Sequence, residues 1–589
     1  MKPIWKWMIG IVACLLVIVA AGGWYLSRHW KPILETRLRQ AVVNATDSLY
    51  QIHYDEVDFN VVTGNASITN LQLIPDTQVY ARRVLEERAP DNIYNIMIAD
   101  LRIRQFHPRR ILRERKLHIN DIIIDTPSIH VMNEYHAYNH TAAKSQDSLM
   151  LYQRISNMLN EVSVENIQFN DIQFKFSMKT DSVVKELALR NINLTLRDIL
   201  IDSLSQVDTS RLYYARGIDL DMPGFRHETA DSFYYVSFDR LQVATAEREV
   251  VLTGLKYAPR MNRSEFYRRK KEAKDMAIIS LPHIRFEHID LHRFVNSQKI
   301  YAGSLHIDSG TVAISNDLRY PKRLTNKIGK SPHQLLLKLK QHLKIDSVLI
   351  DGVDVSYAEI SKKHKKEGKI TFDRVNGIIR NVTNDSSALI QNNTMEADLT
   401  TYVMNTGKLT TVFAFDMLDK HGAFTYRGRL GPMNGKPFNQ IMTPLLNAEI
   451  ASANIEGLHF DVKADDHRAR GSLQFDYNKM KLNLIASDNS KQRSSMKVAS
   501  FLTNSFIIND SNPDANGKYH TGRINYARPH TYSFFKTLTQ SLLQGIKECA
   551  GISEERERRL MNTAEEAKKA SEKTEGFFKR VFGKKKKKD

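Results

Sequence analysis

Residues 162–174 read Val-Ser-Val-Glu-Asn-Ile-Gln-Phe-Asn-Asp-Ile-Gln-Phe, and residues 345–355 read Ile-Asp-Ser-Val-Leu-Ile-Asp-Gly-Val-Asp-Val. Both stretches contain one spacing, in which an apolar residue is followed by apolar residues three and five positions later. The step of two residues is that of a β-strand with one buried face. The step of three is odd, so in an unbroken strand it would turn the apolar set to the opposite face. A bulge at the intervening dipeptide would restore the face, so the spacing predicts strands that bend once and continue.

The same spacing recurs at nine places along the chain. The nine sets are Ile68, Leu71 and Leu73; Ile98, Leu101 and Ile103; Ile119, Ile122 and Ile124; Val164, Ile167 and Phe169; Leu189, Ile192 and Leu194; Phe238, Leu241 and Val243; Phe286, Ile289 and Leu291; Ile345, Val348 and Ile350; and Ile455, Leu458 and Phe460. Polar, turn-prone dipeptides such as Asn120-Asp121 and Arg190-Asn191 occupy many of the predicted bends.

A longer repeat is visible over this spacing. Residues 151–198 and 334–382 both read as a short amphipathic helix, a bent strand, a polar hairpin and a second strand. Repeated units that bury their apolar face only against their neighbours form quasi-one-dimensional folds. Residues 50–530 are therefore expected to form one repeated β region, with two unrelated β-sandwich domains as the alternative.

The expected fold class is mainly β: an elongated, repeated antiparallel sheet that forms a groove, with short peripheral helices. Helices are expected near residues 31–49, 146–161, 264–277 and 332–343, and from residue 532 onward.

An uncharged stretch at residues 7–27 predicts one transmembrane signal anchor. It lies between Lys6 and Arg28, with aromatic residues near both ends. As a helix it would span about 30 Å, the thickness of a hydrocarbon core. Residues 1–6 are then cytoplasmic, residues 28–49 form a juxtamembrane helix, and the bulk of the chain lies in the periplasm of a bacterium. A cleaved signal peptide ending near Ala20 is the alternative, although this apolar stretch is longer than the usual signal-peptide core.

Composition excludes several classes of protein. The chain has 589 residues, is 42% hydrophobic and has a net charge of +19. The apolar content, with 9% aromatic residues, is close to ordinary globular usage, which excludes wholesale disorder, collagen and coiled coil. Only one stretch could cross a bilayer, which excludes a polytopic transporter. The two cysteines, Cys14 and Cys549, cannot build a disulfide framework or a cysteine-rich zinc site.

The C-terminal region divides into an amphipathic helix at residues 531–552 and a charged helix or linker with a polybasic tail at residues 553–589. Aromatic and basic residues beside one another favour an anionic membrane surface. A solvated, disordered end is the alternative, and nucleic acid is not expected as a partner. The residues predicted to contact the membrane surface are Phe577, Phe578, Lys579, Arg580, Phe582, Lys584, Lys585, Lys586, Lys587 and Lys588.

No motif predicts catalysis. The chain contains no Gly-x-Gly-x-x-Gly sequence, no Walker loop and no Gly-x-Ser-x-Gly elbow. Glu134, His136 and His140 could ligate a metal only if this stretch were helical, and its polar composition favours a loop. We therefore expect neither an enzyme nor a cofactor.

Two blocks of sequence carry a family resemblance. Residues 50–73 form a first strand block after the anchor, and residues 444–462 with 469–482 form a late one. Together with the repeated bent strands, the chain resembles the AsmA-like family of bacterial envelope proteins, in the style of Bacteroidetes-type members. The resemblance covers most of residues 1–545. It implies inner-membrane anchoring, a periplasmic β-rich groove, and a role in outer-membrane lipid transport or assembly, without catalytic residues.

The expected mechanism is a trough whose apolar face shields the acyl chains of phospholipids from water. The alternative is a non-enzymatic scaffold that assists outer-membrane protein assembly, with a filled core and an envelope protein as partner. The candidate groove residues are Ile122, Ile124, Ile167, Phe169, Ile172, Phe174, Ile192, Leu194, Ile289, Leu291, Val348, Ile350, Leu458 and Phe460.

Overall fold

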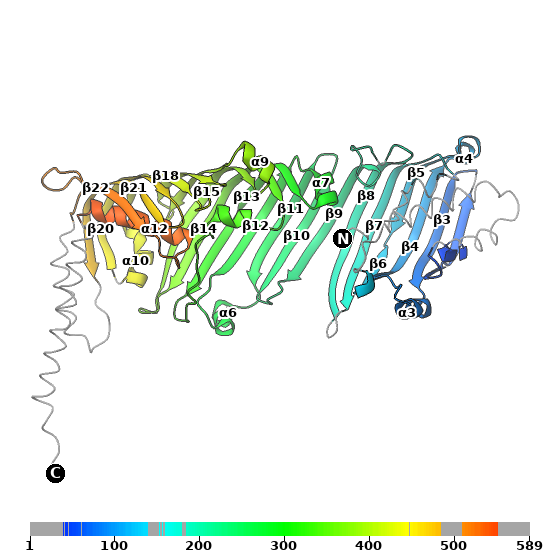
Figure 1. Cartoon of the computed structure of the whole chain (residues 1–589), viewed down its shortest axis with the longest axis horizontal. Helices are drawn as coiled ribbons and strands as arrows, with labels where there is room; N and C mark the ends of the chain where they lie inside the picture. Colours follow the sequence, from blue (N-terminus) through cyan, green and yellow to red (C-terminus); the bar gives the residue numbers. More distant parts are fainter. Residues whose placement is uncertain are drawn as a thin grey trace, which may run out of the picture. The chain divides into compact units, whose positions relative to one another are not determined.

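The computed structural model (Figure 1) describes residues 39–40, 42–44, 46–60, 62–139, 152, 156, 159–179, 184–205, 207–446, 448–484 and 509–551. The predicted anchor and the predicted membrane-surface tail lie outside these residues. None of the helices in the described part of the chain has the length and apolar character needed to cross a membrane. The chain divides into two compact units: residues 1–225 with 238–252, and residues 226–237 with 253–589.

The prediction of a mainly β protein is confirmed, because 22 strands are joined by hydrogen bonds into one sheet. The prediction of an antiparallel sheet is confirmed for most pairings and wrong for some. Among the pairings whose register is described, three are parallel: β5 with β7, β6 with β7, and β13 with β14. β13 and β14 are joined by residues 318–342, which include α8, whereas many of the antiparallel neighbours follow one another in the chain after short turns.

The first unit is built on β1 to β8. The strands are β1 (Tyr50–His53), β2 (Glu56–Asn60), β3 (Asn65–Pro75), β4 (Asn92–Phe106), β5 (Lys116–Asp125), β6 (Ser128–Glu134), β7 (Glu161–Lys179) and β8 (Val184–Ile201). Its helices are α3 (Thr77–Leu85), α4 (Pro108–Glu114) and the 3-10 turn η1 (Ala137–Asn139). The strands β9 (Ala215–Glu228), β10 (Tyr234–Ala244) and β11 (Glu249–Pro259) contribute residues to both units.

The pairing of β7 organises the first unit. β5 and β6 follow each other in the chain and both run parallel to β7, with a constant offset of 45 residues from Lys116 opposite Glu161 to Glu134 opposite Lys179. The other edge of β7 pairs antiparallel with β8. One long strand is thus matched by two shorter ones in the same register.

The second unit contains the remaining elements. Its strands are β12 (Met276–Glu287), β13 (Ile300–Asp317), β14 (Leu343–Ile360), β15 (Glu367–Thr383), β16 (Thr394–Val403), β17 (Gly407–Asp416), β18 (Phe424–Leu430), β19 (Met433–Asn434), β20 (Ala448–Ala464), β21 (Arg468–Leu484) and β22 (Thr521–Ala527). Its helices are α6 (Arg263–Lys270), α7 (Leu291–Ser297), α8 (Pro332–Leu337), α9 (Ser386–Gln391), α10 (Asn439–Leu446), α12 (Phe534–Cys549) and the 3-10 turn η2 (Lys436–Phe438).

The three-residue steps of the sequence pattern coincide with irregularities in the strands. Asn70 and Asn191, both at predicted bends, have left-handed backbones with φ of 50° and 57°. At the step containing Asn120, the left-handed residue is instead Gln105 on the paired strand β4, and its side chain accepts a hydrogen bond from Asn120 at 2.7 Å. A bend in one strand is therefore shared with its neighbour, which keeps the apolar residues of both on one face.

Several predicted helix boundaries are wrong. The helix expected at residues 264–277 ends at Lys270, where Lys271 adopts a left-handed cap, and residue 276 already begins β12. The helix expected at 332–343 ends at Leu337, and β14 begins at Leu343. The helix expected at 146–161 falls largely outside the described residues, and β7 begins at its last residue, Glu161.

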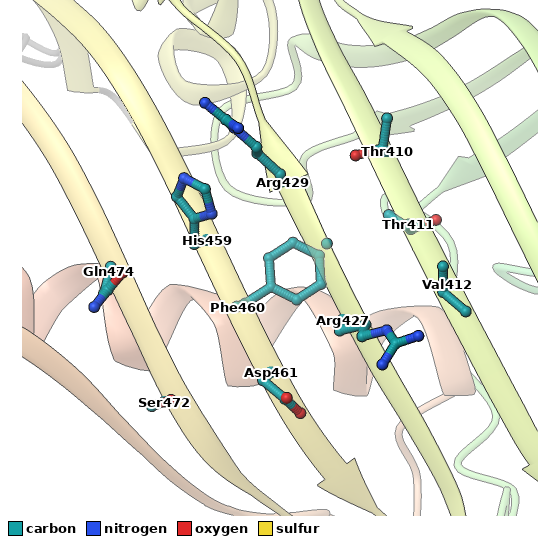
Figure 2. A pocket seen from close by; sticks show the side chains of 11 residues that line it. Thr410, Thr411, Val412, Arg427, Arg429, His459, Phe460, Asp461, Ser472 and Gln474 are labelled. Carbon is teal, nitrogen blue, oxygen red and sulfur yellow. The ribbon is translucent and has the colours of Figure 1, made fainter.

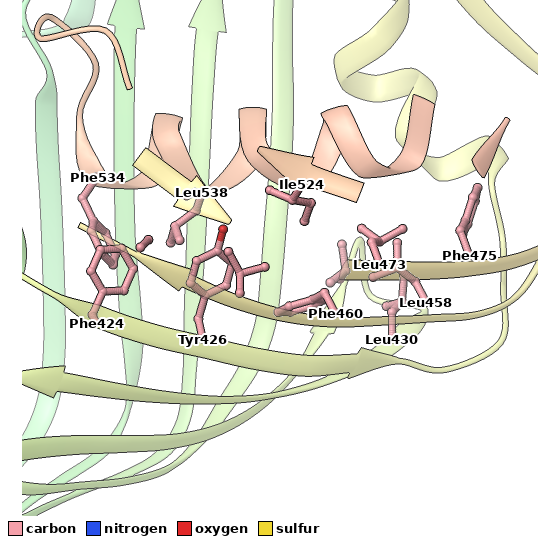
Figure 3. Packing of buried hydrophobic residues seen from close by; sticks show 14 of the residues in the cluster. Phe424, Tyr426, Leu430, Leu458, Phe460, Leu473, Phe475, Ile524, Phe534 and Leu538 are labelled. Carbon is pink, nitrogen blue, oxygen red and sulfur yellow. The ribbon is translucent and has the colours of Figure 1, made fainter. Parts of the chain in front are cut away.

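The C-terminal part of the second unit has a packed core beneath α12 (Figure 3). Leu473 and Ile524, on β21 and β22, are 0% and 1% exposed and face the helix. The helix approaches closely because Gly545 faces this surface, and a Cβ at Gly545 would lie 2.9 Å from the Cβ of Leu473. The hydroxyl groups of Tyr426 and Ser541 are hydrogen-bonded at 2.7 Å within the core.

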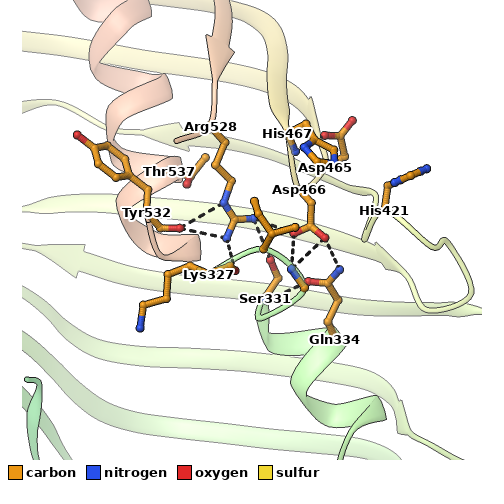
Figure 4. A network of polar contacts seen from close by, with 12 residues as sticks. Lys327, Ser331, Gln334, His421, Asp465, Asp466, His467, Arg528, Tyr532 and Thr537 are labelled. Carbon is orange, nitrogen blue, oxygen red and sulfur yellow. Dashed lines mark hydrogen bonds and ion pairs between the residues drawn. The ribbon is translucent and has the colours of Figure 1, made fainter. Parts of the chain in front are cut away.

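A buried ion pair fixes the segment before α8 to this core (Figure 4). Arg528 contacts Asp466 at 3.1 Å, and their side chains are 1% and 4% exposed. Asp466 also accepts a hydrogen bond from Gln334 at 2.7 Å. The guanidinium of Arg528 donates to the carbonyl oxygens of Lys327 and Tyr532 at 3.1 and 3.2 Å. Because both charges have several partners, their removal from water is compensated.

Candidate functional site

In the first unit, the candidate groove residues lie in cross-strand rows on one face of the sheet. Ile122 lies opposite Ile167, and Ile124 lies opposite Phe169. Phe169 in turn lies opposite Leu194 on β8. Directly opposed residues share a face, so strands far apart in the sequence contribute to one apolar surface. Ile172 and Ile192 are opposite each other where the bends of β7 and β8 meet.

These side chains are buried. Ile122, Ile124, Ile167, Phe169, Ile172, Ile192 and Leu194 are 2–8% exposed, whereas Phe174 is half-buried. The sequence pattern thus identified residues that the fold brings together, and in this unit they are shielded from solvent.

In the second unit, Val348 and Ile350 belong to an apolar face on β12, β13 and β14. Val348 lies opposite Leu305, and Ile350 lies opposite Ile307. These rows continue onto β12, where Phe286 and Ile284 are the partners of Leu305 and Ile307. We name this surface the open apolar face; it consists of Ile279, Leu281, Ile284, Phe286, Leu305, Ile307, Val312, Ile314, Val348, Ile350 and Val355.

Most side chains of the open apolar face are half-buried; Ile284 and Val348, at 7% exposed, are the exceptions. Sequence reasoning missed the β13 members, because Ser, His, Asp and Gly separate the apolar residues between Leu305 and Ile314. Their parallel register with β14, offset by 43 residues from Ile300 opposite Leu343, is the signal that aligns them. That register is a long-range property that local periodicity does not contain.

Ile289 and Leu291 do not continue the strand pattern. β12 ends at Glu287, and Leu291 is the first residue of α7. The physical reason is the side chain of Asp290, which accepts a hydrogen bond from the backbone N–H of Arg293 at 2.9 Å and caps the helix. The assignment of these residues to a bent strand is therefore wrong.

Leu458 and Phe460 lie within the packed core beneath α12. They are 7% and 8% exposed and belong to one cluster with Leu473, Ile524 and Phe534. A helix of the same chain thus occupies the space beside them.

The opposite face of the sheet is polar. On β12 and β13, His283 contacts Asp308 at 3.0 Å, and His306 contacts Glu287 at 3.1 Å. In the first unit, Lys175 hydrogen-bonds Glu186 at 2.8 Å and lowers the pKa of that carboxyl group. Hydrogen bonds from Asn170 and then Arg102 likewise lower the pKa of Asp125. The two faces therefore have separate chemistry: apolar rows on one side and paired charges on the other.

His136, one of the three possible metal ligands named above, packs against tyrosine side chains. The ring of His136 lies 3.0 Å from the hydroxyl oxygen of Tyr80 and stacks on Tyr138 with centroids 5.1 Å apart. His140 lies outside the described residues. Among the residues that are described, no group of three or more His, Cys, Asp or Glu side chains is placed to hold a metal ion.

Comparison with known proteins adds no family. No protein-family model matches the chain, and no curated protein is significantly similar to it in sequence.

Proposed function

We propose that the open apolar face of the second unit binds the acyl chains of phospholipids. The chain would thereby shield or conduct phospholipids toward the outer membrane, as an AsmA-like protein anchored by one span in the inner membrane of a bacterium with its bulk in the periplasm. The observation that carries the proposal is the open apolar face, where aligned rows of large aliphatic side chains are only half-buried.

The chemistry of this face suits an acyl chain. Ile307 and Ile350 are neighbours across β13 and β14, and Val312 and Val355 repeat the arrangement further along the same strands. Each methylene group moved from water onto such a surface gains about 0.8 kcal/mol at full burial. Because aliphatic contact is not directional, an acyl chain can slide along a row without breaking hydrogen bonds.

Polar groups border the apolar rows. Tyr357, which lies opposite Ile314, donates a hydrogen bond to Glu359 at 2.9 Å. Burial, and then the adjacent carboxylate, raise the pKa of the Tyr357 hydroxyl. We propose that the headgroup of the lipid stays in water, so this face needs no dedicated polar pocket to hold it.

The test compares two adjacent residues of β12. Ile279 is half-buried on the open apolar face, and its neighbour Ile278, which is 38% exposed, points to the opposite face. The full chain carrying Ile279→Lys or Ile278→Lys is purified in mild detergent. Bound phospholipid is counted on the intact complex by native mass spectrometry, and a parallel sample is extracted to identify the lipid.

We expect phospholipid bound to the unmodified chain and to the Ile278→Lys variant, with a loss in the Ile279→Lys variant. Thermal melts of both variants, followed by circular dichroism, check that they fold. Equal phospholipid in two folded variants, or none in the unmodified chain, would contradict the proposal.

The second candidate is a scaffold that assists outer-membrane protein assembly. The observation that favours it is the packed core beneath α12, in which side chains of the same chain cover Leu458 and Phe460. A lipid-free chain that copurifies with an outer-membrane protein would favour this candidate.

A further inference from the structure

The polar face of β17 to β22, on the side of the sheet away from α12, carries an excess of positive charge. We name it the basic face. It presents the exposed cations Lys408, Arg427, Arg429, Lys463, Arg470 and Arg523. The neighbouring residues Leu473 and Ile524 point the other way, into the packed core. Strand alternation therefore places the cations on the side opposite α12.

The strand register gathers these cations. Arg427 on β18 lies opposite Asp461 on β20, which lies opposite Ser472 on β21, and Ser472 lies opposite Arg523 on β22. Lys463 lies opposite Arg470. Asp461 is the one carboxylate within these rows, so the rows carry an excess of positive charge. Asp416, Glu456 and Asp476 lie elsewhere on β17, β20 and β21.

The six cations have no carboxylate partners among the residues that the structure describes. Within the described ranges, the side chains of the six cations form neither an ion pair nor a hydrogen bond. By contrast, Lys116 pairs with Glu161 at 2.9 Å, and Arg240 pairs with Asp221 at 2.7 Å. Ion pairs such as these do not compensate the positive charge of the six cations on the basic face.

A shallow cavity of about 500 Å³ lies within the basic face (Figure 2). Arg427, Arg429 and His459 line it, together with Thr410 and Ser472. Asp461 and Phe460 line it as well, so two guanidinium groups face one carboxylate there. The figure shows these side chains on the side of the strands away from the helix. Guanidinium and hydroxyl groups are the donors that bind phosphate oxygens.

We propose that the basic face docks on an anionic phospholipid membrane, with phosphate groups of the lipid surface held by Arg427 and Arg429. The choice of a lipid surface rests on the proposed function, whereas the positive excess does not. A sheet face presents its cations side by side, as a flat anionic surface requires. Phe460 lines the cavity, but it is 8% exposed and belongs to the packed core beneath α12. The outward residues Thr425, Arg427, Arg429, Arg470 and Ser472 of β18 and β21 include no Phe, Tyr or Trp, so these two strands offer no stacking platform of the kind typical of single-stranded nucleic-acid binders.

The experiment measures vesicle binding by the full chain held in amphipol. All variants carry glutamine at Lys579, Arg580, Lys584, Lys585, Lys586, Lys587 and Lys588, which removes the cations of the basic tail as an alternative contact. Flotation is compared for vesicles of phosphatidylcholine with and without phosphatidylglycerol. The test variant is Arg427→Glu with Arg429→Glu, and the matched control is Lys362→Glu with Lys363→Glu, which makes the same charge change at exposed residues of the β14–β15 hairpin.

We expect the parent chain and the hairpin control to bind phosphatidylglycerol vesicles, and the strand variant to bind them at least about tenfold more weakly. Circular dichroism melts verify that the strand variant folds. Equal binding by the two double variants would overturn the proposal. So would tighter binding of the parent chain to duplex DNA than to the vesicles, with the same loss in the strand variant.

The vesicle experiment can succeed or fail independently of the test of acyl-chain binding. A strand variant that retains copurified phospholipid but loses vesicle binding supports the basic face alone. A chain that binds vesicles through the basic face yet copurifies without phospholipid would contradict acyl-chain binding and leave membrane docking in place.

Discussion

The second unit contains two stretches of the same sheet with similar apolar rows, and the rows differ in how deeply their side chains are buried. On β12 to β14, the row Phe286, Leu305 and Val348 belongs to the open apolar face, where most side chains are half-buried. On β18 to β22, the row that includes Tyr426, Val462 and Ile524 is 0–1% exposed and lies beneath α12. The alternation of residues is alike in both, and the difference lies in a helix that packs on one stretch.

This difference separates two roles for one sequence pattern. A bent strand with alternating apolar residues specifies a surface that must be covered, but it does not specify the cover. Beneath α12, a helix of the same chain covers the apolar rows and stabilises the fold. On the open apolar face, we propose that the acyl chains of a lipid cover the rows and that this contact is the function of the face.

The buried ion pair should give the largest loss of stability. Asp466→Ala leaves Arg528 buried without its carboxylate, and removing one partner of such a pair costs about 3–5 kcal/mol. Chemical denaturation followed by circular dichroism measures the change. Asp461→Ala removes an exposed carboxylate from β20, the strand that leads into the turn holding Asp466. It is the control and should change the free energy of unfolding by less than about 0.5 kcal/mol.

Truncating one leucine in each stretch tests the comparison itself. Leu473→Ala should lower the free energy of unfolding by about 2–5 kcal/mol, because the residue is 0% exposed beneath α12. Leu305→Ala, the same substitution on the open apolar face, should cost about 1 kcal/mol because this side chain already contacts solvent. Equal losses would show that the two stretches are packed alike.

The contact between α12 and β22 should be sensitive to one methyl group. A Cβ at Gly522 would overlap the carbonyl oxygen of Gly545, so Gly522→Ala should destabilise the core by about 1–3 kcal/mol. Gly431→Ala is the control, since its Cβ would meet only the carbonyl oxygen of Lys408 at 3.5 Å. Hydrogen exchange of the α12 amides reports whether the helix has loosened.

The smallest effect concerns pH. His333 is 1% exposed beside the ring of Phe415, and burial lowers its pKa. Below about pH 6.5 the unfolded chain binds a proton at this residue that the folded chain does not. Stability should therefore fall as the pH drops below about 6.5 and continue to fall until the folded pKa is reached, by at most about 1.4 kcal/mol per pH unit. A His333→Leu variant should have a flatter profile of stability between pH 7 and pH 5.

The sequence predicted the strands better than their arrangement. Local alternation was sufficient to place Ile122, Ile167 and Leu194 on one face, because strand periodicity is a short-range property. It failed at Leu291, where the cap formed by Asp290 turns an apparent strand into α7. Helix ends near Lys270 and Leu337 were placed too late because propensity continued past the residues that cap them.

The arrangement depends on contacts across long stretches of chain. The parallel register of β13 and β14 spans 43 residues, and Arg528 meets Asp466 across 62 residues. The basic face is likewise assembled from several strands between Lys408 and Arg523, so no local run of charged residues in the sequence indicates it. Such features follow from pairing and are absent from any window of sequence.

The most direct test of the central claim replaces leucine by photoreactive leucine throughout the full chain, expressed in cells and irradiated before extraction. Leu281 and Leu305 report on the open apolar face, and Leu458 and Leu473 report on the packed core. The account predicts phospholipid adducts on Leu281 and Leu305 and none on Leu458 or Leu473. Adducts missing from the first pair, or equally frequent on both pairs, would contradict it.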